Sequence, residues 1–292
     1  MSIGVSDLTT LRAGRPEAIA EAAARRVRRP LLRDGGRLMI IAADHPARGA
    51  LAAGGDPLAM ANRAGLLERL VTALSRPGVD GVLGTADILE DLLLLGVLDD
   101  KVVLCSMNRG GLAGASFELD DRFTGYRPQD ITRMRFDGGK LLLRIGYDDS
   151  GSLATLHAAA RAVDELAERR VPVFVEPFLS HRRDGRIRND LGARAVATSL
   201  AIASGLGGTS AYTWLKVPVT ADPDDMAEAM ETSTLPAVVL GGEVSADQDA
   251  TFAGWRKALA LPTVRGLVVG RSLLYPPDGD VGAAVDTAVG LL

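Results

Sequence analysis

KLLLRIGYDDSGSLATLHAAARAVDELAERRVPVFVEP (140–177) decides the fold class, because this stretch contains a strand, a helix and a second strand in succession. Residues 140–147 and 171–177 are short apolar runs, whereas 153–170 carries apolar residues at helical spacing and is rich in strong helix formers. Two strands joined through a helix normally lie parallel in one sheet. The stretch therefore predicts an α/β fold with a parallel sheet covered by helices.

The same unit repeats along the chain. Further apolar runs rich in β-branched residues lie at 38–44, 81–85, 102–106, 212–219, 237–242 and 266–271, mostly with helix-patterned segments between them. Eight such strands in 292 residues favour a closed (β/α)8 TIM barrel over an open doubly wound sheet, since one barrel takes about 250 residues. No linker interrupts the pattern, so we expect a single domain over 1–292.

Two segments stand outside the repeat. Residues 16–29, PEAIAEAAARRVRR, predict an extra helix within an N-terminal segment of 1–37, and we expect this helix to cover the floor of the barrel. The longest irregular segment, 108–130, follows the third strand. In a barrel this position lies on the catalytic face, so we expect a lid or a substrate loop there.

The composition argues against several partners and compartments. A net charge of −4 offers no basic excess for nucleic acid or an anionic membrane. The single cysteine, Cys105, excludes an internal disulfide and fits a reducing compartment, and we expect it to be a buried small hydrophobe. No run is typical of a signal peptide or a membrane helix. The sequence therefore predicts a cytoplasmic protein, and it leaves open whether the protein is a homo-oligomer.

One lysine stands out as a candidate nucleophile. Only four of the 33 basic residues are lysines, and Lys216 lies inside the apolar run Trp-Leu-Lys-Val-Pro-Val. Burial inside a barrel lowers the pKa of a lysine, and a neutral amine can form an imine with a ketone. A second cation such as Lys140 or Arg144 would lower this pKa further. The alternative is that Lys216 only pairs with a structural acid.

Two carboxylates are candidates for proton transfer. Asp44 and Glu176 come at the ends of the first and fifth predicted strands, where the active sites of such barrels lie. Cleavage of a carbon–carbon bond beside an imine needs a proton removed from a hydroxyl and a proton returned to carbon. Two carboxylates in different environments can divide these steps. Alternatively, each is only an ion-pair partner of Lys216 or Arg144.

Glycines and a basic residue follow the last two strands. Gly241 and Gly242 follow the seventh strand, and Gly270 and Arg271 follow the eighth. Many barrels bind phosphate at this position, through backbone N–H groups and a basic side chain. The sequence therefore predicts that these residues bind a phosphate group.

The histidines argue against a metal-dependent reaction. The chain has three, and His157 lies in the helix predicted over 153–170. His45 is expected to bind substrate, to hold Asp44 or to have a local structural role, and His181 is expected in a solvated basic loop. Because a metal-dependent aldolase usually places several imidazoles around its ion, we predict neither a metal nor a cofactor.

These segments together resemble class I, Schiff-base aldolases of the (β/α)8 fold. The resemblance is to enzymes related to tagatose-1,6-bisphosphate aldolase and sulfofructose-phosphate aldolase in the DeoC-like superfamily, and more distantly to archaeal-type fructose-bisphosphate aldolases. It runs from about residue 38 to residue 275 through six segments in register: DHPARGAL (44–51), KLLL (140–143), FVEP (174–177), LKVPV (215–219), LGGEVS (240–245) and VGRS (269–272). The resemblance implies an imine at Lys216, acid–base work at Glu176, substrate contact at Lys140 and a phosphate clamp at Gly270 and Arg271.

Departures from the pattern bear on the substrate. Archaeal-type enzymes place a tyrosine acid on the fifth strand where this chain has Phe178, which favours the branch that uses a glutamate. The overall likeness is to an actinobacterial aldolase-like group associated with inositol catabolism. It implies 2-deoxy-5-keto-gluconate 6-phosphate as substrate, cleaved to dihydroxyacetone phosphate and malonate semialdehyde. Arg109, Arg182 and Arg183 would then hold the far carboxylate.

The sequence thus predicts a carbon–carbon lyase acting on a small phosphorylated keto-acid or ketose, with Lys216, Glu176 and Asp44 as catalytic residues. The predicted substrate-binding residues are Lys140, Arg144, His45, Gly241, Gly242, Gly270 and Arg271. The alternatives are a sugar-phosphate isomerase or decarboxylase on the same barrel, an aldolase for a ketose bisphosphate or a sulfo-sugar phosphate, and a non-catalytic sugar-phosphate sensor.

Overall fold

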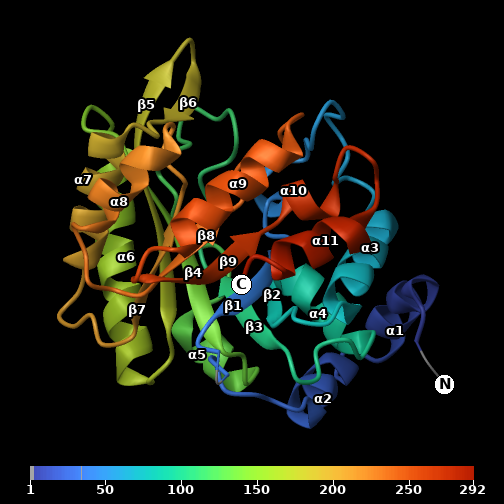
Figure 1. Cartoon of the computed structure of the whole chain (residues 1–292). Helices are drawn as coiled ribbons and strands as arrows, with labels where there is room; N and C mark the ends of the chain where they lie inside the picture. Colours follow the sequence, from blue (N-terminus) through green and yellow to red (C-terminus); the bar gives the residue numbers. More distant parts are fainter. Residues whose placement is uncertain (1–2, 34) are drawn as a thin grey trace.

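The computed structural model, which describes residues 3–33 and 35–292, contains a closed barrel of eight parallel strands (Figure 1). The strands are β1 (Leu38–Ala42), β2 (Gly81–Gly84), β3 (Val102–Ser106), β4 (Gly138–Ile145), β5 (Val173–Arg183), β7 (Thr213–Val217), β8 (Ala237–Leu240) and β9 (Val264–Val269). Pairing of β1 with β9 and of β4 with β5 closes the sheet on itself. The predicted (β/α)8 TIM barrel is confirmed, and each of the eight apolar runs forms one strand.

Helices surround the barrel (Figure 1). They are α3 (Arg63–Ser75), α4 (Ala86–Leu94), α5 (Pro128–Arg133), α6 (Gly151–Glu168), α7 (Ala193–Ser204), α8 (Met226–Met230), α9 (Gln248–Leu259), α10 (Arg271–Leu274) and α11 (Val281–Val289). The helix predicted over 153–170 is therefore α6. Within residues 3–33 and 35–292, no helix has the length and hydropathy that crossing a membrane requires.

Alternation along the strands separates two apolar layers. In β7, Trp214 packs inside the barrel with Phe174 of β5, at 5.3 Å between ring centroids. Leu215 and Val217 instead belong to the cluster between the strands and the helices. Because successive side chains of a strand point to opposite faces, Lys216 shares the inner face with Trp214. The sequence-based prediction that this lysine faces the barrel interior is therefore confirmed.

The N-terminal segment differs from its prediction. It forms two helices, α1 (Leu8–Gly14) and α2 (Ala18–Arg25), and α2 packs against α4. The floor is sealed by the chain after α2: Arg26 donates to the carbonyl of Lys101 at 2.8 Å, and Leu31 and Leu32 pack against the inner apolar cluster. The chain segment 26–33, rather than the predicted helix, thus covers the bottom of the barrel.

The fifth strand continues beyond the barrel as a hairpin. It pairs in antiparallel fashion with β6 (Arg186–Asn189), and the hairpin rises at the top of Figure 1, opposite α2. Asp184 and Gly185 form its turn with φ values of 51° and 72°. Asp-Gly is a favoured pair for such turns because both residues tolerate positive φ. His181 is exposed, as predicted, but it lies in the hairpin ladder rather than in a loop.

Candidate active site

One carboxylate lies between two lysines inside the barrel. Lys216 Nζ of β7 contacts Glu176 Oε1, and Lys140 Nζ of β4 contacts Glu176 Oε2. Strand β5 lies between β4 and β7 in the sheet, so its Glu176 can reach both neighbours. Lys140 is 1% exposed, Lys216 6% and Glu176 8%. The three groups therefore form one buried, hydrogen-bonded charge cluster.

Asp44 extends this cluster. Its Oδ2 atom accepts hydrogen bonds from Lys140 Nζ at 3.2 Å and from Ser106 Oγ at 3.0 Å, and it contacts the guanidinium group of Arg109. Arg109 Nε also donates to Ser106 Oγ at 3.0 Å. One oxygen of Asp44 thus has three donors around it, whereas each oxygen of Glu176 contacts one lysine.

Burial and neighbouring charge set the protonation of the cluster. Burial lowers the pKa of Lys216 and of Lys140, Arg109 lowers both further, and Glu176 opposes the shift in each. Burial by itself would raise the pKa of Glu176, but the two lysines outweigh it and hold this pKa below its ordinary value. Glu176 is therefore ionised at neutral pH, and the lysines lose a proton more readily than exposed lysines do.

The predicted phosphate turns lie beside this cluster. A Cβ atom at Gly270 would lie 2.3 Å from the carbonyl oxygen of Ala42, and one at Gly241 would lie 2.4 Å from Val269 Cγ1. Only glycine fits at either position, and the backbone there is open to a ligand on the cavity side. Burial lowers the pKa of Arg271, and its Nε is buried with no hydrogen-bond partner among the described residues. A bound anion would satisfy this donor.

His45 faces the phosphate turns rather than holding Asp44. Its Nδ1 lies 3.9 Å from Asp44 Oδ1, beyond hydrogen-bond distance, and has no other partner among the described residues. A Cβ atom at Gly270 would lie 3.0 Å from His45 Cε1. Burial, together with the charges of Arg271 and Lys216, holds the pKa of His45 well below its ordinary value. The ring is therefore neutral at neutral pH and can donate or accept one hydrogen bond.

Arg144 anchors the segment 108–130. Its guanidinium group donates to Glu118 Oε1 at 2.6 Å, to the carbonyl of Glu118 at 2.7 Å and to the carbonyl of Gly111 at 3.3 Å. Asn108 accepts from the N–H of Leu142 at 2.7 Å and donates to the carbonyl of Leu142 at 2.6 Å. These contacts make the segment a fixed wall of the site. The direct contact between Arg144 and substrate stays a prediction.

A cavity of about 670 Å³ at the carboxyl ends of the strands, called the barrel cavity below, joins these groups. The ten residues predicted to be catalytic or substrate-binding all line it: Asp44, His45, Lys140, Arg144, Glu176, Lys216, Gly241, Gly242, Gly270 and Arg271. Of the three arginines predicted to hold a far carboxylate, Arg109 lines it, whereas Arg182 and Arg183 do not. Sequence reasoning missed Ser106 as part of the cluster, although Ser106 ends the third strand and the same rule would have found it.

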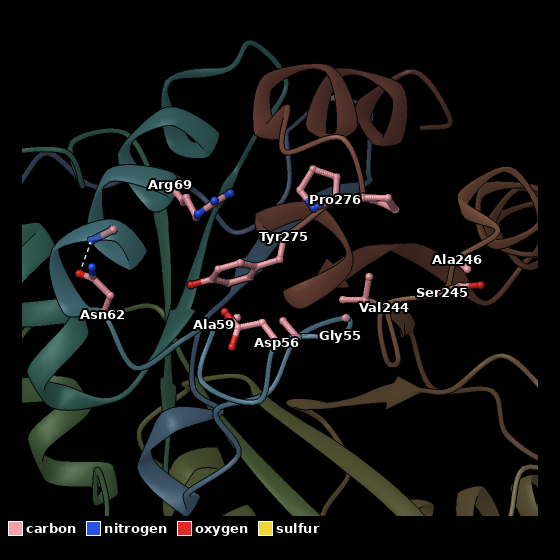
Figure 2. Close-up of a pocket in the computed structure, with 14 residues that line it drawn as sticks. Gly55, Asp56, Ala59, Asn62, Arg69, Val244, Ser245, Ala246, Tyr275 and Pro276 are labelled. Carbon is pink, nitrogen blue, oxygen red and sulfur yellow. Dashed lines mark hydrogen bonds between the residues drawn. The ribbon is translucent and has the colours of Figure 1, made fainter.

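A second cavity, of about 640 Å³, lies outside the barrel beside α3 and the turn after α10 (Figure 2). Tyr275 crosses it, with Arg69 and Asp56 on opposite sides of the ring. The guanidinium carbon of Arg69 lies 4.7 Å from the ring centroid, and Arg69 Nη1 donates to the carbonyl of Leu274 at 2.8 Å. The 14 residues that line this second cavity include no lysine. The groups for imine chemistry therefore belong to the barrel cavity.

The fold and the site define a class: a (β/α)8 barrel with a buried lysine–glutamate–lysine cluster at the carboxyl ends of its strands. Within this class the chain belongs to the Cgl0159-like family, whose profile matches residues 36–289. The crystal structure of Cgl0159 from Corynebacterium glutamicum is similar at a TM-score of 0.95 and 55% identity, over 98% of this chain and 95% of that chain. The sequence matches none of the curated proteins.

Two more distant structures share the barrel. A Schiff base-forming fructose-1,6-bisphosphate aldolase has a TM-score of 0.68 at 19% identity, over 94% of this chain and 99% of that chain. An archaeal fructose-1,6-bisphosphate aldolase has a TM-score of 0.69 at 18% identity, over 94% and 98% of the two chains. At this level of identity the similarity shows a common fold.

Proposed function

We propose that the protein is a class I aldolase that forms an imine between Lys216 and the ketone of a phosphorylated keto-acid or ketose. The observation that carries the proposal is the position of Lys216, buried at the carboxyl end of β7 and paired with a carboxylate that a second lysine shares. The aldolases with the same barrel support it, and in one archaeal structure the catalytic lysine is covalently bound to the carbinolamine intermediate.

The amine of Lys216 is suited to the first step. Lys140 contacts two carboxylates, Glu176 and Asp44, whereas Lys216 contacts Glu176 alone. Burial, with the charges of Arg109 and Arg271, lowers the pKa of Lys216, so a fraction of this lysine is the free amine that imine formation needs. Its Nζ attacks the ketone carbon to give a carbinolamine, which loses water to form the iminium ion.

Glu176 is the better placed of the two carboxylates for moving protons. Once Lys216 is part of an iminium ion, its nitrogen keeps a single N–H, and the Glu176 carboxylate has oxygen lone pairs left to accept a proton from the substrate. Glu176 can then remove the proton from the substrate hydroxyl whose carbon becomes the aldehyde. The electrons of the broken carbon–carbon bond form an enamine, which is protonated at carbon before water releases the ketone. Asp44, with three donors on one oxygen, orients Lys140 instead.

As substrate we propose a phosphorylated keto-acid with anionic groups at both ends, in particular 2-deoxy-5-keto-gluconate 6-phosphate. Its ketone neighbours the carbon that carries phosphate, which fits the position of Lys216 beside the turns at Gly242 and Gly270. Seven basic side chains but only four carboxylates line the barrel cavity, which favours a ligand with more than one negative charge. Cleavage would release dihydroxyacetone phosphate and malonate semialdehyde, and we place this reaction in inositol catabolism.

Reductive trapping tests the proposed imine. The protein is incubated with dihydroxyacetone phosphate and borohydride, and its peptides are mapped by mass. We expect the mass of the reduced adduct on the peptide that contains Lys216, its loss in Lys216→Met, and no label on the exposed Lys257. An adduct on another lysine alone, or none with any phosphorylated ketose or keto-acid, would overturn the proposal.

The substrate is tested separately with a panel of phosphorylated keto-acids, ketose bisphosphates and sulfo-sugar phosphates, assayed for a triose phosphate product. We expect faster turnover of the keto-acid phosphate than of a ketose bisphosphate. The opposite preference would keep the aldolase chemistry and overturn the proposed substrate.

A further inference from the structure

Arg109 lines the barrel cavity although it does not belong to a strand. Its side chain is 7% exposed, contacts the Asp44 carboxylate and donates to Ser106 Oγ. Burial lowers its pKa to about 10, so it stays positively charged at neutral pH. The contacts with Asp44 and Ser106 leave it no obvious role as a ligand for a distant substrate carboxylate.

The chain after β3 directs Arg109 inward. Asn108 is clamped to Leu142 of β4 by two hydrogen bonds and also donates to the carbonyl of Asp121 at 3.2 Å. The N–H of Arg109 donates to Thr124 Oγ1 at 3.3 Å. The backbone at residues 108 and 109 is therefore held by hydrogen bonds, and the guanidinium group is part of the buried cluster.

The charge count of the cluster gives Arg109 a consequence for Lys216. Three basic groups, Arg109, Lys140 and Lys216, share two carboxylates, Asp44 and Glu176. Full ionisation would leave one excess positive charge in the barrel interior, which is unfavourable. Arginine does not release its proton at neutral pH, whereas a buried lysine does. One of the two lysines is therefore neutral.

We propose that Arg109 is a positioning residue that keeps Lys216 available as the free amine, by occupying Asp44 and leaving Glu176 to both lysines. This inference rests on the proposed aldolase function. Without Arg109, the charge of Asp44 would balance only the ammonium group of Lys140, which it already contacts, and Glu176 would balance that of Lys216. Each lysine would then have a carboxylate of its own, and the nucleophile would be protonated.

Several other charged or titratable groups surround Lys216 and stay in place when Arg109 is changed. They are Glu176 from β5, Lys140 from β4, Asp44 and His45 after β1, and Arg271 after β9. Burial is the largest cause that lowers the pKa of Lys216, and Arg109 and Arg271 both add to it. Loss of Arg109 alone should therefore raise this pKa without restoring an ordinary, exposed lysine.

The test is the pH dependence of imine trapping in Arg109→Met. Reduction by cyanoborohydride with dihydroxyacetone phosphate is followed from about pH 6 to about pH 10, where lysine protonation changes. We expect trapping at neutral pH to slow by about tenfold for each unit by which the pKa of Lys216 rises, and to approach the wild-type rate at alkaline pH. Arg122→Met, which changes an exposed arginine of the same segment, should leave the curve unchanged.

A role that is only structural would slow trapping equally at every pH, and this result would overturn the inference. Arg109→Lys serves as the second variant if the methionine variant does not fold. Because a lysine at position 109 can lose its proton and so give up its hold on Asp44, the low-pH side of the trapping curve of Arg109→Lys should move to higher pH than in the wild type. An unmoved curve would overturn the inference. Wild-type protein that is not trapped at any pH would instead refute the proposed aldolase function.

Discussion

Replacing Glu176 with glutamine should destabilise the protein strongly at neutral pH and much less at alkaline pH. The carboxylate contacts Lys140 and Lys216, and each lysine is at most 6% exposed. In the variant, Asp44 is still occupied by Arg109, so one more lysine than in the wild type must be neutral in the folded state. The unfolded chain keeps that lysine protonated up to its ordinary pKa of about 10.4.

The size of the effect follows from this difference. Holding a lysine neutral at pH 7 against a pKa of about 10.4 costs about 5 kcal/mol, since each pKa unit is worth about 1.4 kcal/mol. At pH 9 the same cost is about 2 kcal/mol. On unfolding, the variant takes up one proton more than the wild type does. The loss of unfolding free energy caused by the substitution therefore shrinks as pH rises. A shift of about 2–4 °C per kcal/mol gives a Tm deficit of about 10–20 °C at pH 7 and about 4–8 °C at pH 9.

Thermal unfolding followed by circular dichroism at both pH values measures this deficit. Glu243→Gln is the matched control, because Glu243 is an exposed carboxylate at the rim of the same cavity and should change Tm little. A Glu176→Gln protein with the wild-type Tm at pH 7, or with the same deficit at both values, would show that the lysines are not charged partners of this carboxylate. The reasoning about the cluster would then be refuted.

Three further changes test other parts of the site. Gly270→Ala should lower Tm by several degrees and weaken inhibition by inorganic phosphate, because the added Cβ would lie 2.3 Å from a backbone oxygen. Gly242→Ala should cost only about 1–2 kcal/mol, because its φ is 69° but its added Cβ would have no described atom within 4 Å. Equal effects of the two changes would contradict this. Arg271→Gln should raise KM for the phosphorylated substrate at least about tenfold with a smaller change in kcat, since charge-assisted hydrogen bonds to phosphate are strong, and an unchanged KM would remove Arg271 from the phosphate site. Asn108→Ala should speed hydrogen exchange over 108–130 while leaving β4 protected, and unchanged exchange would show that the clamp does not hold this segment.

The barrel and most of the cluster were predictable because they depend on local signals. Period-two alternation placed Lys216 on the inner face of its strand, and the rule that active sites lie at strand ends selected Glu176 and Asp44. The boundaries shifted by about two residues at several strands, as in the fourth, which begins at Gly138 rather than residue 140.

The missed features depend on contacts between distant residues. Arg109 was predicted to hold a substrate carboxylate, but its contact with Asp44 could not be predicted, because the direction of its side chain depends on the bonds between Asn108 and Leu142, 34 positions further along the chain. The partners of Arg144 could not be anticipated either, since Glu118 belongs to an irregular segment without periodicity. The hairpin after β5 has a local signal, because Asp184 followed by Gly185 is a favoured pair for a two-residue turn.

That hairpin contributes lining residues to the barrel cavity that do not belong to a barrel strand. Ile187, Arg188 and Asn189 reach the cavity from β6, which pairs only with the outer part of β5 and takes no part in closing the barrel. Residues there can be exchanged without opening a barrel strand or disturbing the lysines beneath. Directed evolution toward new acceptors should therefore begin with libraries at these positions, where the range of accepted molecules can change while the bond-forming chemistry is preserved.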